Sequence, residues 1–128
     1  EPGKINEYKV IQAAEQAQIS ETINNLRLKY LTSIGERGVQ LSGGQRQRIG
    51  IARALYKDRD VFIFDEATSA LDNQTEKNIM QEISKFKDNK TIFIIAHRIT
   101  TLKQCDSIFR MNTDHTIERV NYSQIEFD

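Results

Sequence analysis

Two neighbouring carboxylates are the first residues of this chain that could carry out chemistry. Asp65 and Glu66 follow the apolar run VFIF (61–64), which has the composition of a strand covered on both faces of a parallel sheet. Ligands of such sheets bind beyond the carboxyl ends of the strands. One carboxylate there can hold Mg²⁺, and the other can orient or deprotonate a water that attacks a phosphorus atom. A solvated acidic turn would contain the same two residues.

A histidine follows a second apolar run. His97 comes directly after TIFIIA (91–96), which we also interpret as a buried strand. Neighbouring strands lie about 5 Å apart, so placing the two strands side by side predicts that His97 lies next to Glu66. A histidine beside a carboxylate at this end of a parallel sheet is a candidate catalytic group. His115 lacks this context, and we expect it in a surface turn.

Two adjacent glycines precede an amphipathic run in LSGGQRQRIGIARAL (41–55). Ser42 can cap a helix there, and Gly43 and Gly44 leave the first N–H groups of that helix without side-chain obstruction. A helix N-terminus carries about half a positive charge and unpaired N–H groups, which together favour a phosphate. The same residues would also serve as a plain cap and turn.

The elements that must position these residues alternate between helix and strand. An amphipathic helix over 75–86, capped by Asp72 or Asn73, connects the two apolar strands. Strand, helix and strand in this order predict a parallel crossover unit. Residues 5–31 have helical periodicity, and 106–111 predicts a third strand followed by a hairpin partner. The predicted fold class is α/β, with parallel strands and an N-terminal helical part.

Composition argues against a nucleic-acid-binding, membrane-spanning or disulfide-bonded chain. The 18 basic and 18 acidic residues give a net charge of zero, without the basic bias of a nucleic-acid-binding face. No apolar run approaches the ~20 residues of a membrane span, and no signal peptide is recognisable. The single cysteine, Cys105, excludes an internal disulfide and suits a reducing compartment. We expect a soluble, cytosolic chain without a nucleic-acid partner.

Taken together, the motifs resemble those of the nucleotide-binding domains of ATP-binding-cassette (ABC) transporters. The resemblance covers 35–98 in order and spacing, and it weakens after Met111. LSGGQ (41–45) resembles the family signature, VFIFDE the Walker B strand, SALD (69–72) the D-loop and His97 the H-loop histidine. GERG (35–38) resembles the loop by which exporters of the family touch their membrane domains.

The resemblance implies an ATPase that works as a dimer. Two nucleotide-binding domains would meet head to tail, bury two ATP molecules and drive attached membrane domains from the cytoplasmic side of a membrane. In each site, Asp65 would assist Mg²⁺, Glu66 would polarise the attacking water and His97 would contact the γ-phosphate. The partner domain would contribute contacts to the ATP phosphate from Ser42, Gly43, Gly44 and Gln45. Asp72 would contact the opposite subunit.

One expected motif is not in the sequence. The string G-x-x-x-x-G-K-[ST], whose N–H groups and lysine hold the β- and γ-phosphates, does not occur. We therefore interpret the chain as the C-terminal part of such a domain and expect it to be inactive alone. Residues 1–57 would form the helical subdomain with GERG and the signature helix, and 58–128 the C-terminal part of the α/β ATPase core. The absent phosphate-loop strand would lie between the strands at 91–96 and 106–111, where we expect a gap or edges that pair elsewhere.

Two other functions remain open on the sequence. A soluble ABC-family ATPase that acts on ribosomes or DNA would share the signature and the carboxylate pair, although GERG beside LSGGQRQR favours an exporter. A non-catalytic dimerisation module could keep the surface alone. The intact Asp65, Glu66 and His97 argue against such a module, because it would not need residues that activate water.

Overall fold

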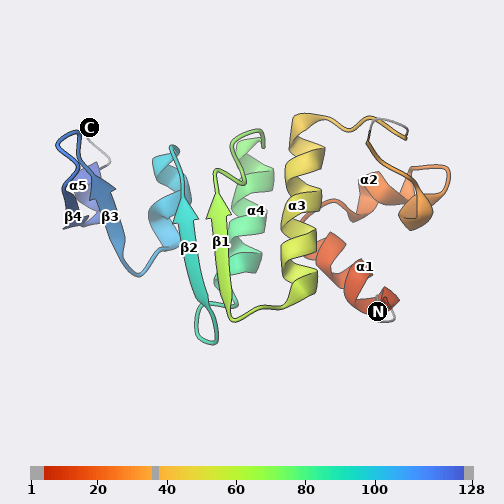
Figure 1. Cartoon of the computed structure of the whole chain (residues 1–128), viewed down its shortest axis with the longest axis horizontal. Helices are drawn as coiled ribbons and strands as arrows, with labels where there is room; N and C mark the ends of the chain where they lie inside the picture. The colour runs from red at the N-terminus through yellow and green to blue at the C-terminus, as the bar shows by residue number, and fades with distance from the viewer. Residues whose placement is uncertain (1–4, 36–37, 126–128) are drawn as a thin grey trace.

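The computed structural model describes residues 5–35 and 38–125, which form two small sheets and their surrounding helices (Figure 1). The helical segments are α1 (Glu7–Gln16), α2 (Ser20–Asn24), η1 (Lys29–Leu31), α3 (Gly43–Lys57), α4 (Asn73–Ser84), η2 (Ile99–Gln104) and α5 (Tyr122–Ile125). The strands are β1 (Val61–Asp65), β2 (Thr91–Ile95), β3 (Ile108–Met111) and β4 (Ile117–Val120). The molecule is elongated, with α1 and α2 at one end of its long axis and the β3–β4 hairpin at the other.

Strands β1 and β2 form the first sheet. They are parallel and in register from Val61 opposite Thr91 to Asp65 opposite Ile95. Helix α4 connects them, so the predicted strand, helix and strand unit is confirmed, with Asp72 as the N-cap of the helix. The α/β class predicted from the sequence is confirmed as well.

Strands β3 and β4 form a separate antiparallel hairpin. Its turn is closed by the N–H of Asn112, which donates to the carbonyl of Thr116 at 2.9 Å, and His115 lies in this turn with φ of 66°. Among the described residues β2 pairs only with β1, and β3 only with β4. The expected gap between β2 and β3 is therefore present, and η2 runs through that part of the chain (Figure 1).

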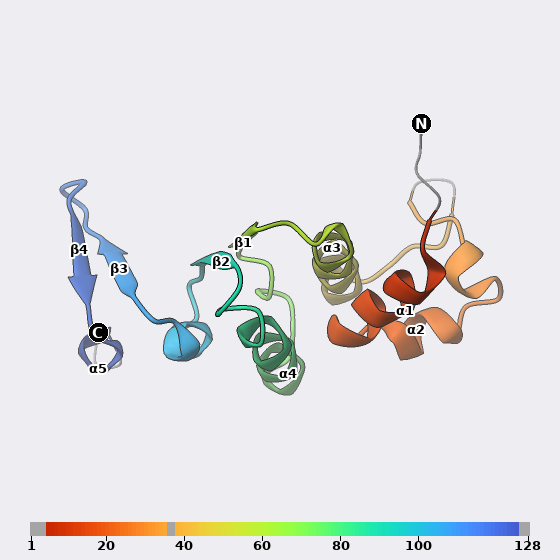
Figure 2. The same ribbon diagram turned by 90° about the horizontal axis from the view of Figure 1, so that it is seen from below.

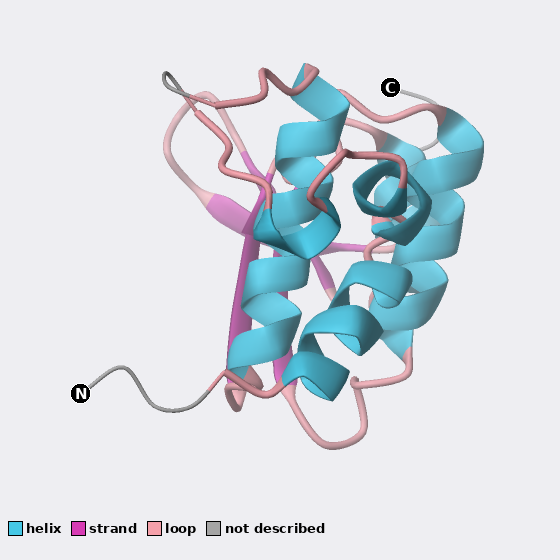
Figure 3. Ribbon diagram, turned by 90° about the vertical axis from the view of Figure 1, so that its right-hand side faces the viewer, coloured by secondary structure: helices cyan, strands magenta, loops and turns pink. Residues whose placement is uncertain are grey.

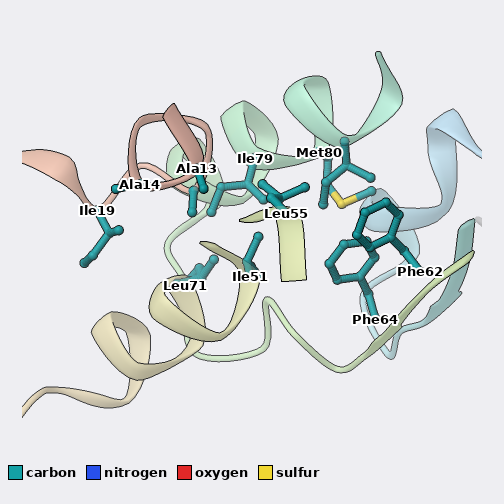
Figure 4. Packing of buried hydrophobic residues seen from close by; sticks show 12 residues of the cluster. Ala13, Ala14, Ile19, Ile51, Leu55, Phe62, Phe64, Leu71, Ile79 and Met80 are labelled. Atoms are coloured by element: carbon teal, nitrogen blue, oxygen red, sulfur yellow. The ribbon is translucent and has the colours of Figure 1, made fainter. Parts of the chain in front are cut away.

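One hydrophobic cluster joins the helices to the first sheet. Helix α4 lies against one face of the β1–β2 pair, as the view from below shows (Figure 2). The fully buried residues Ile51 and Ile79 come from α3 and α4, and Ile19 comes from the turn before α2. The rings of Phe62 and Phe64 stack with centroids 5.9 Å apart at the sheet side of the cluster (Figure 4).

The expectation that the two strands are covered on both faces is wrong for the structure described. Side chains alternate along β1, so Phe62 and Phe64 are buried while Ile63 is 69% exposed. Phe93 of β2 is 57% exposed on the same open face. Both faces of the β1–β2 pair are apolar, but α4 covers only one face. No other described element packs on the opposite face (Figure 2).

The N-terminal helical part packs against α3. Ala13 and Ala14 of α1 are buried in the same cluster as Ile51, and their small side chains let the two helices approach closely. Seen from the α1 and α2 end, the helices gather in front of the strands (Figure 3). Glu36 and Arg37 of the GERG segment lie outside the described residues. No described helix combines the length and the apolar composition needed to cross a bilayer.

The buried position of Ile79 leads to a prediction about stability. Ile79→Ala removes three carbons from a fully buried site and should lower the free energy of unfolding by about 2–5 kcal/mol, because the surrounding side chains fill such a cavity only partly. Lys77→Ala on the exposed side of the same helix should change it by less than about 0.5 kcal/mol. Urea unfolding followed by circular dichroism measures both. Equal effects would mean that α4 is not held by this packing.

Candidate functional site

The chain turns sharply where β1 ends. Asp65 is the last residue of the strand and is exposed, and the N–H of Glu66 still donates to the carbonyl of Ile95 on β2 at 2.9 Å. Glu66 has φ of 47°, in the left-handed region that residues with a side chain seldom adopt. Such a conformation costs free energy and needs support from its surroundings, and it is often found at functional sites.

Glu66 and His97 meet at this end of the sheet. The Nε2 atom of His97 lies 2.8 Å from Oε1 of Glu66, which is a hydrogen bond. The parallel register explains the contact, because it brings the residues that follow β1 and β2 to the same edge. The sequence-based prediction that His97 lies beside Glu66 is therefore confirmed. Both side chains are open to solvent, with 84% of His97 and 47% of Glu66 exposed.

A cleft of about 220 Å³ lies next to this pair. Its walls come from the turn after β1 and from the segment after β2, and they consist of Glu66, Thr68, Ser69, Ala96, His97, Arg98 and Thr101. Hydroxyl, carboxylate, imidazole and guanidinium groups therefore surround one hollow. Of these groups, the Glu66 carboxylate and the His97 imidazole can accept or donate a proton, which suits a reaction of water with a charged substrate.

Asp65 is the candidate Mg²⁺ ligand. Among the described residues, no three acidic, histidine or cysteine side chains gather into a metal site. Mg²⁺ does not need such a cluster, because it is usually bound by one or two carboxylates together with phosphate oxygens of a substrate. An exposed carboxylate one residue before Glu66 fits that kind of site.

The start of α3 is built as a capping box. The N–H of Gln45 donates to Oγ of Ser42 at 3.2 Å, and the N–H of Ser42 donates to Oε1 of Gln45 at 2.9 Å. The first intrahelical donor is the N–H of Arg46, so the N–H groups of Gly43 and Gly44 stay outside the hydrogen bonding of the helix. These two groups can bind an anion. None of the residues 42–45 lines the cleft at Glu66.

Asp72 caps the start of α4. Its carboxylate accepts from the N–H of Gln74 at 3.1 Å, from the N–H of Thr75 at 2.9 Å and from the hydroxyl of Thr75 at 2.6 Å. These hydrogen bonds, that of the Thr75 hydroxyl foremost, hold the pKa of Asp72 below its usual value. The carboxylate is exposed, so a surface contact is available to it in addition to the cap.

A buried polar network lies beneath the cleft. Glu76 of α4 is only 4% exposed, and its carboxylate accepts hydrogen bonds from Thr68 at 3.1 Å, from Arg98 at 2.8 Å and from Thr101. Arg98 also donates to the carbonyls of Leu71 at 2.9 Å and Ser69 at 3.2 Å. The network therefore fastens the 69–72 segment to the residue that follows His97.

Known proteins resemble this chain over nearly its whole length. The family model described as ABC transporter matches residues 1–69, which is more than half of the chain. The chain belongs to the ABC transporter family. It is 44% identical over 97% of its length to an ATP-dependent lipid A-core flippase of Shewanella frigidimarina. It is 48% identical over 91% of its length to the toxin RTX-III translocation ATP-binding protein of Actinobacillus pleuropneumoniae.

A solved structure gives the same result for the fold of this ABC chain. A bacterial Atm1-family ABC exporter with ATP bound matches 95% of the chain with a TM-score of 0.85 and 36% identity. The chain spans 21% of that structure, 21% of the flippase and 16% of the toxin translocation protein. The resemblance to part of an exporter nucleotide-binding domain is thus confirmed.

Two polar residues of this ABC chain were missed by sequence reasoning. Glu76 precedes Ile79 and Met80 on the buried face of α4, and Gln47 precedes Ile51 and lies on the same side of α3. Each is a polar residue at the beginning of an apolar stripe, at helical spacing from its buried members. For Glu76 that position indicates a buried hydrogen-bonding role, and it was the signal available in the sequence. Gln47 is only half-buried, and its contacts with the turn after β1 do not follow from its position on α3.

The Glu76 network leads to a prediction about pH. Burial opposes ionisation of Glu76, but hydrogen bonds from Thr101, Arg98 and Thr68 outweigh it and hold its pKa below the ordinary value of 4.5. The carboxylate therefore stabilises the fold above that value, and this contribution is lost as the pH falls through the native pKa. Glu76→Gln should lower the free energy of unfolding by about 1–3 kcal/mol at neutral pH, with a smaller difference in acid.

Urea unfolding at a series of pH values measures this difference. Glu82→Gln is the matched control on α4, because its ion pair with Lys85 lies at the surface and should contribute less than about 1 kcal/mol. A Glu76→Gln effect that stays constant from neutral to acidic pH would contradict the role assigned to its charge.

Proposed function

We propose that this chain is part of the nucleotide-binding domain of an ABC exporter that couples ATP binding and hydrolysis to transport across a membrane. The observation that carries the proposal is the 2.8 Å contact between Glu66 and His97 at the carboxyl end of a parallel strand pair, with Asp65 next to it. This end of the sheet is where α/β proteins bind ligands. A carboxylate and an imidazole in contact there suit the activation of a water.

In the proposed reaction, Glu66 orients the attacking water and accepts its proton. His97 holds the Glu66 carboxylate through their hydrogen bond and, in line with the family resemblance, contacts the γ-phosphate of ATP. Asp65 would hold Mg²⁺, which when bound neutralises charge on the phosphate oxygens. The reaction transfers the γ-phosphoryl group to water and releases ADP and phosphate.

The start of α3 would serve a second ATP site. Its free N–H groups at Gly43 and Gly44 and its positive helix end favour a phosphate, but residues 42–45 do not line the cleft at Glu66. We therefore propose a head-to-tail dimer in which Ser42, Gly43, Gly44 and Gln45 contact ATP held by a partner domain. Asp72, exposed at the D-loop, would contact that partner.

The wider organisation is proposed on the same basis. Residues 1–57 would act as the helical subdomain and 58–128 as part of the ATPase core, on the cytoplasmic side of a membrane. The GERG segment would contact transmembrane domains. The relatives include a lipid A-core flippase and a toxin translocation protein, which support an exporter over a ribosome- or DNA-associated ATPase. The contact of Glu66 with His97 favours a catalytic domain over a dimerisation module.

The role of Glu66 leads to a prediction for the full-length exporter. Glu66→Gln keeps the size of the side chain and removes the base, so ATP hydrolysis should fall by roughly 10²–10⁴, which corresponds to about 3–5 kcal/mol of barrier. ATP should still bind and still join two domains, because the groups proposed to hold the phosphates are unchanged. The measurements are phosphate release and the ATP-bound dimer on gel filtration.

Glu118→Gln is the matched control, because its carboxylate lies in the β3–β4 hairpin and pairs with Arg110. It should hydrolyse ATP at the wild-type rate.

Asp65→Asn should weaken ATP binding as well as hydrolysis, and His97→Ala should slow turnover without trapping the dimer as firmly. A Glu66→Gln exporter that hydrolyses ATP normally would assign the activation of water to another residue.

The missing phosphate loop leads to a prediction for the 128-residue chain alone. Because the phosphate loop supplies most triphosphate contacts in P-loop ATPases and does not occur in this sequence, the chain should bind Mg-ATP no more tightly than about millimolar, or about −4 kcal/mol. It should release no phosphate. Isothermal titration calorimetry measures the affinity, with Mg²⁺ alone as the control titration. Micromolar binding would contradict the proposal and indicate a different nucleotide site.

A further inference from the structure

A single glutamine of α3 holds the turn that follows Glu66. The Nε2 group of Gln47 donates to the carbonyl of Glu66 at 3.2 Å and to Oγ of Ser69 at 2.8 Å. Its Oε1 accepts from the N–H of Ala70 at 2.9 Å. The amide group of this one side chain therefore makes three hydrogen bonds to the turn, one at Glu66 and two at Ser69 and Ala70.

The turn that Gln47 holds contains Glu66, whose backbone conformation is strained. Glu66 has φ of 47°, and its carbonyl accepts from the N–H of Ser69 at 3.2 Å as well as from Gln47. A left-handed residue other than glycine persists only when neighbouring contacts hold it. The hydrogen bond from Gln47 is accepted by the main-chain carbonyl of Glu66, in the residue that carries the carboxylate. It therefore acts on the direction of the carboxylate through the backbone, without touching the carboxylate itself.

The start of α3 packs against the same turn. A Cβ atom on Gly44 would lie 3.0 Å from the carbonyl oxygen of Ala70 and 3.4 Å from Cδ2 of Leu71. The helix and the turn are therefore closer than a side chain at position 44 would allow without a shift. Arg98 holds the carbonyls of Ser69 and Leu71 from the other side. The turn is fixed between α3 and the segment after His97.

We propose that Gln47 is a positioning residue for the hydrolysis reaction, which fixes the orientation of Glu66 and ties it to the start of α3 in the same chain. This inference rests on the proposed function, in which Glu66 activates the water. Loss of the three hydrogen bonds leaves the αL turn at Glu66 less restrained. The carboxylate then spends less time in the orientation that accepts a proton from water, and turnover slows while ATP binding is unchanged.

The test uses the full-length exporter with Gln47→Met, which keeps the length of the side chain and removes its hydrogen bonds. The kcat for ATP hydrolysis should fall about fivefold to tenfold, with the KM for ATP changed by less than about twofold. Gln81→Met is the matched control, because it makes the same change at an exposed position of α4, and it should leave both constants at wild-type values.

Two further measurements separate positioning from general loss of structure. Hydrogen exchange of the Ala70 amide should become faster in Gln47→Met and not in Gln81→Met, because Gln47 is the acceptor for that N–H. Ser69→Ala removes one of the three partners of Gln47. Its effect on kcat should therefore be smaller in the Gln47→Met background than in wild type, as expected for two residues that share an interaction.

The outcomes separate this inference from the function on which it rests. A Gln47→Met exporter with wild-type kcat overturns the inference, and the proposed function stands if Glu66→Gln is inactive in the same assay. A KM that rises as kcat falls, or effects of Gln47→Met and Ser69→Ala that simply multiply, also overturns it. Normal hydrolysis by Glu66→Gln overturns both proposals.

Discussion

The parallel pairing of β1 with β2 is the constraint on which the rest of the site depends. Because the two strands run in the same direction and in register, Glu66 and His97 leave the sheet at one edge and meet at 2.8 Å. The N–H of Glu66 extends the ladder by one more bond to Ile95. An antiparallel pair, or a register shifted by two residues, would place these side chains too far apart to touch.

The turn after β1 shows how a small domain can hold a strained residue in place. Glu66 adopts a left-handed conformation at an exposed sheet edge, where the hydrophobic core offers no direct support. Polar contacts provide it instead, from Gln47 on one side and Arg98 on the other. Arg98 is in turn fixed by the buried carboxylate of Glu76, so the rigidity of the core reaches the site through hydrogen bonds.

Local patterns and one family resemblance predicted much of this structure. The Asp72 cap, the α4 crossover and the contact of His97 with Glu66 all follow from sequence spacing combined with simple sheet geometry. Gln47 escaped notice because its three bonds depend on how α3 lies against a turn about twenty residues away. The expectation that Ile63 is buried was wrong. An apolar strand indicates that both of its faces should be covered, but it does not identify which element covers them.

The open face of the β1–β2 pair has a consequence for handling the chain. Val61, Ile63, Phe93 and Ile95 are exposed on this face, and among the described residues β2 has no strand on its second edge. An edge strand with unpaired backbone N–H and C=O groups, next to an exposed apolar surface, favours association between molecules. In concentrated solution the isolated chain should therefore aggregate through this sheet. Solubility, more than folding, would limit how the isolated chain can be prepared.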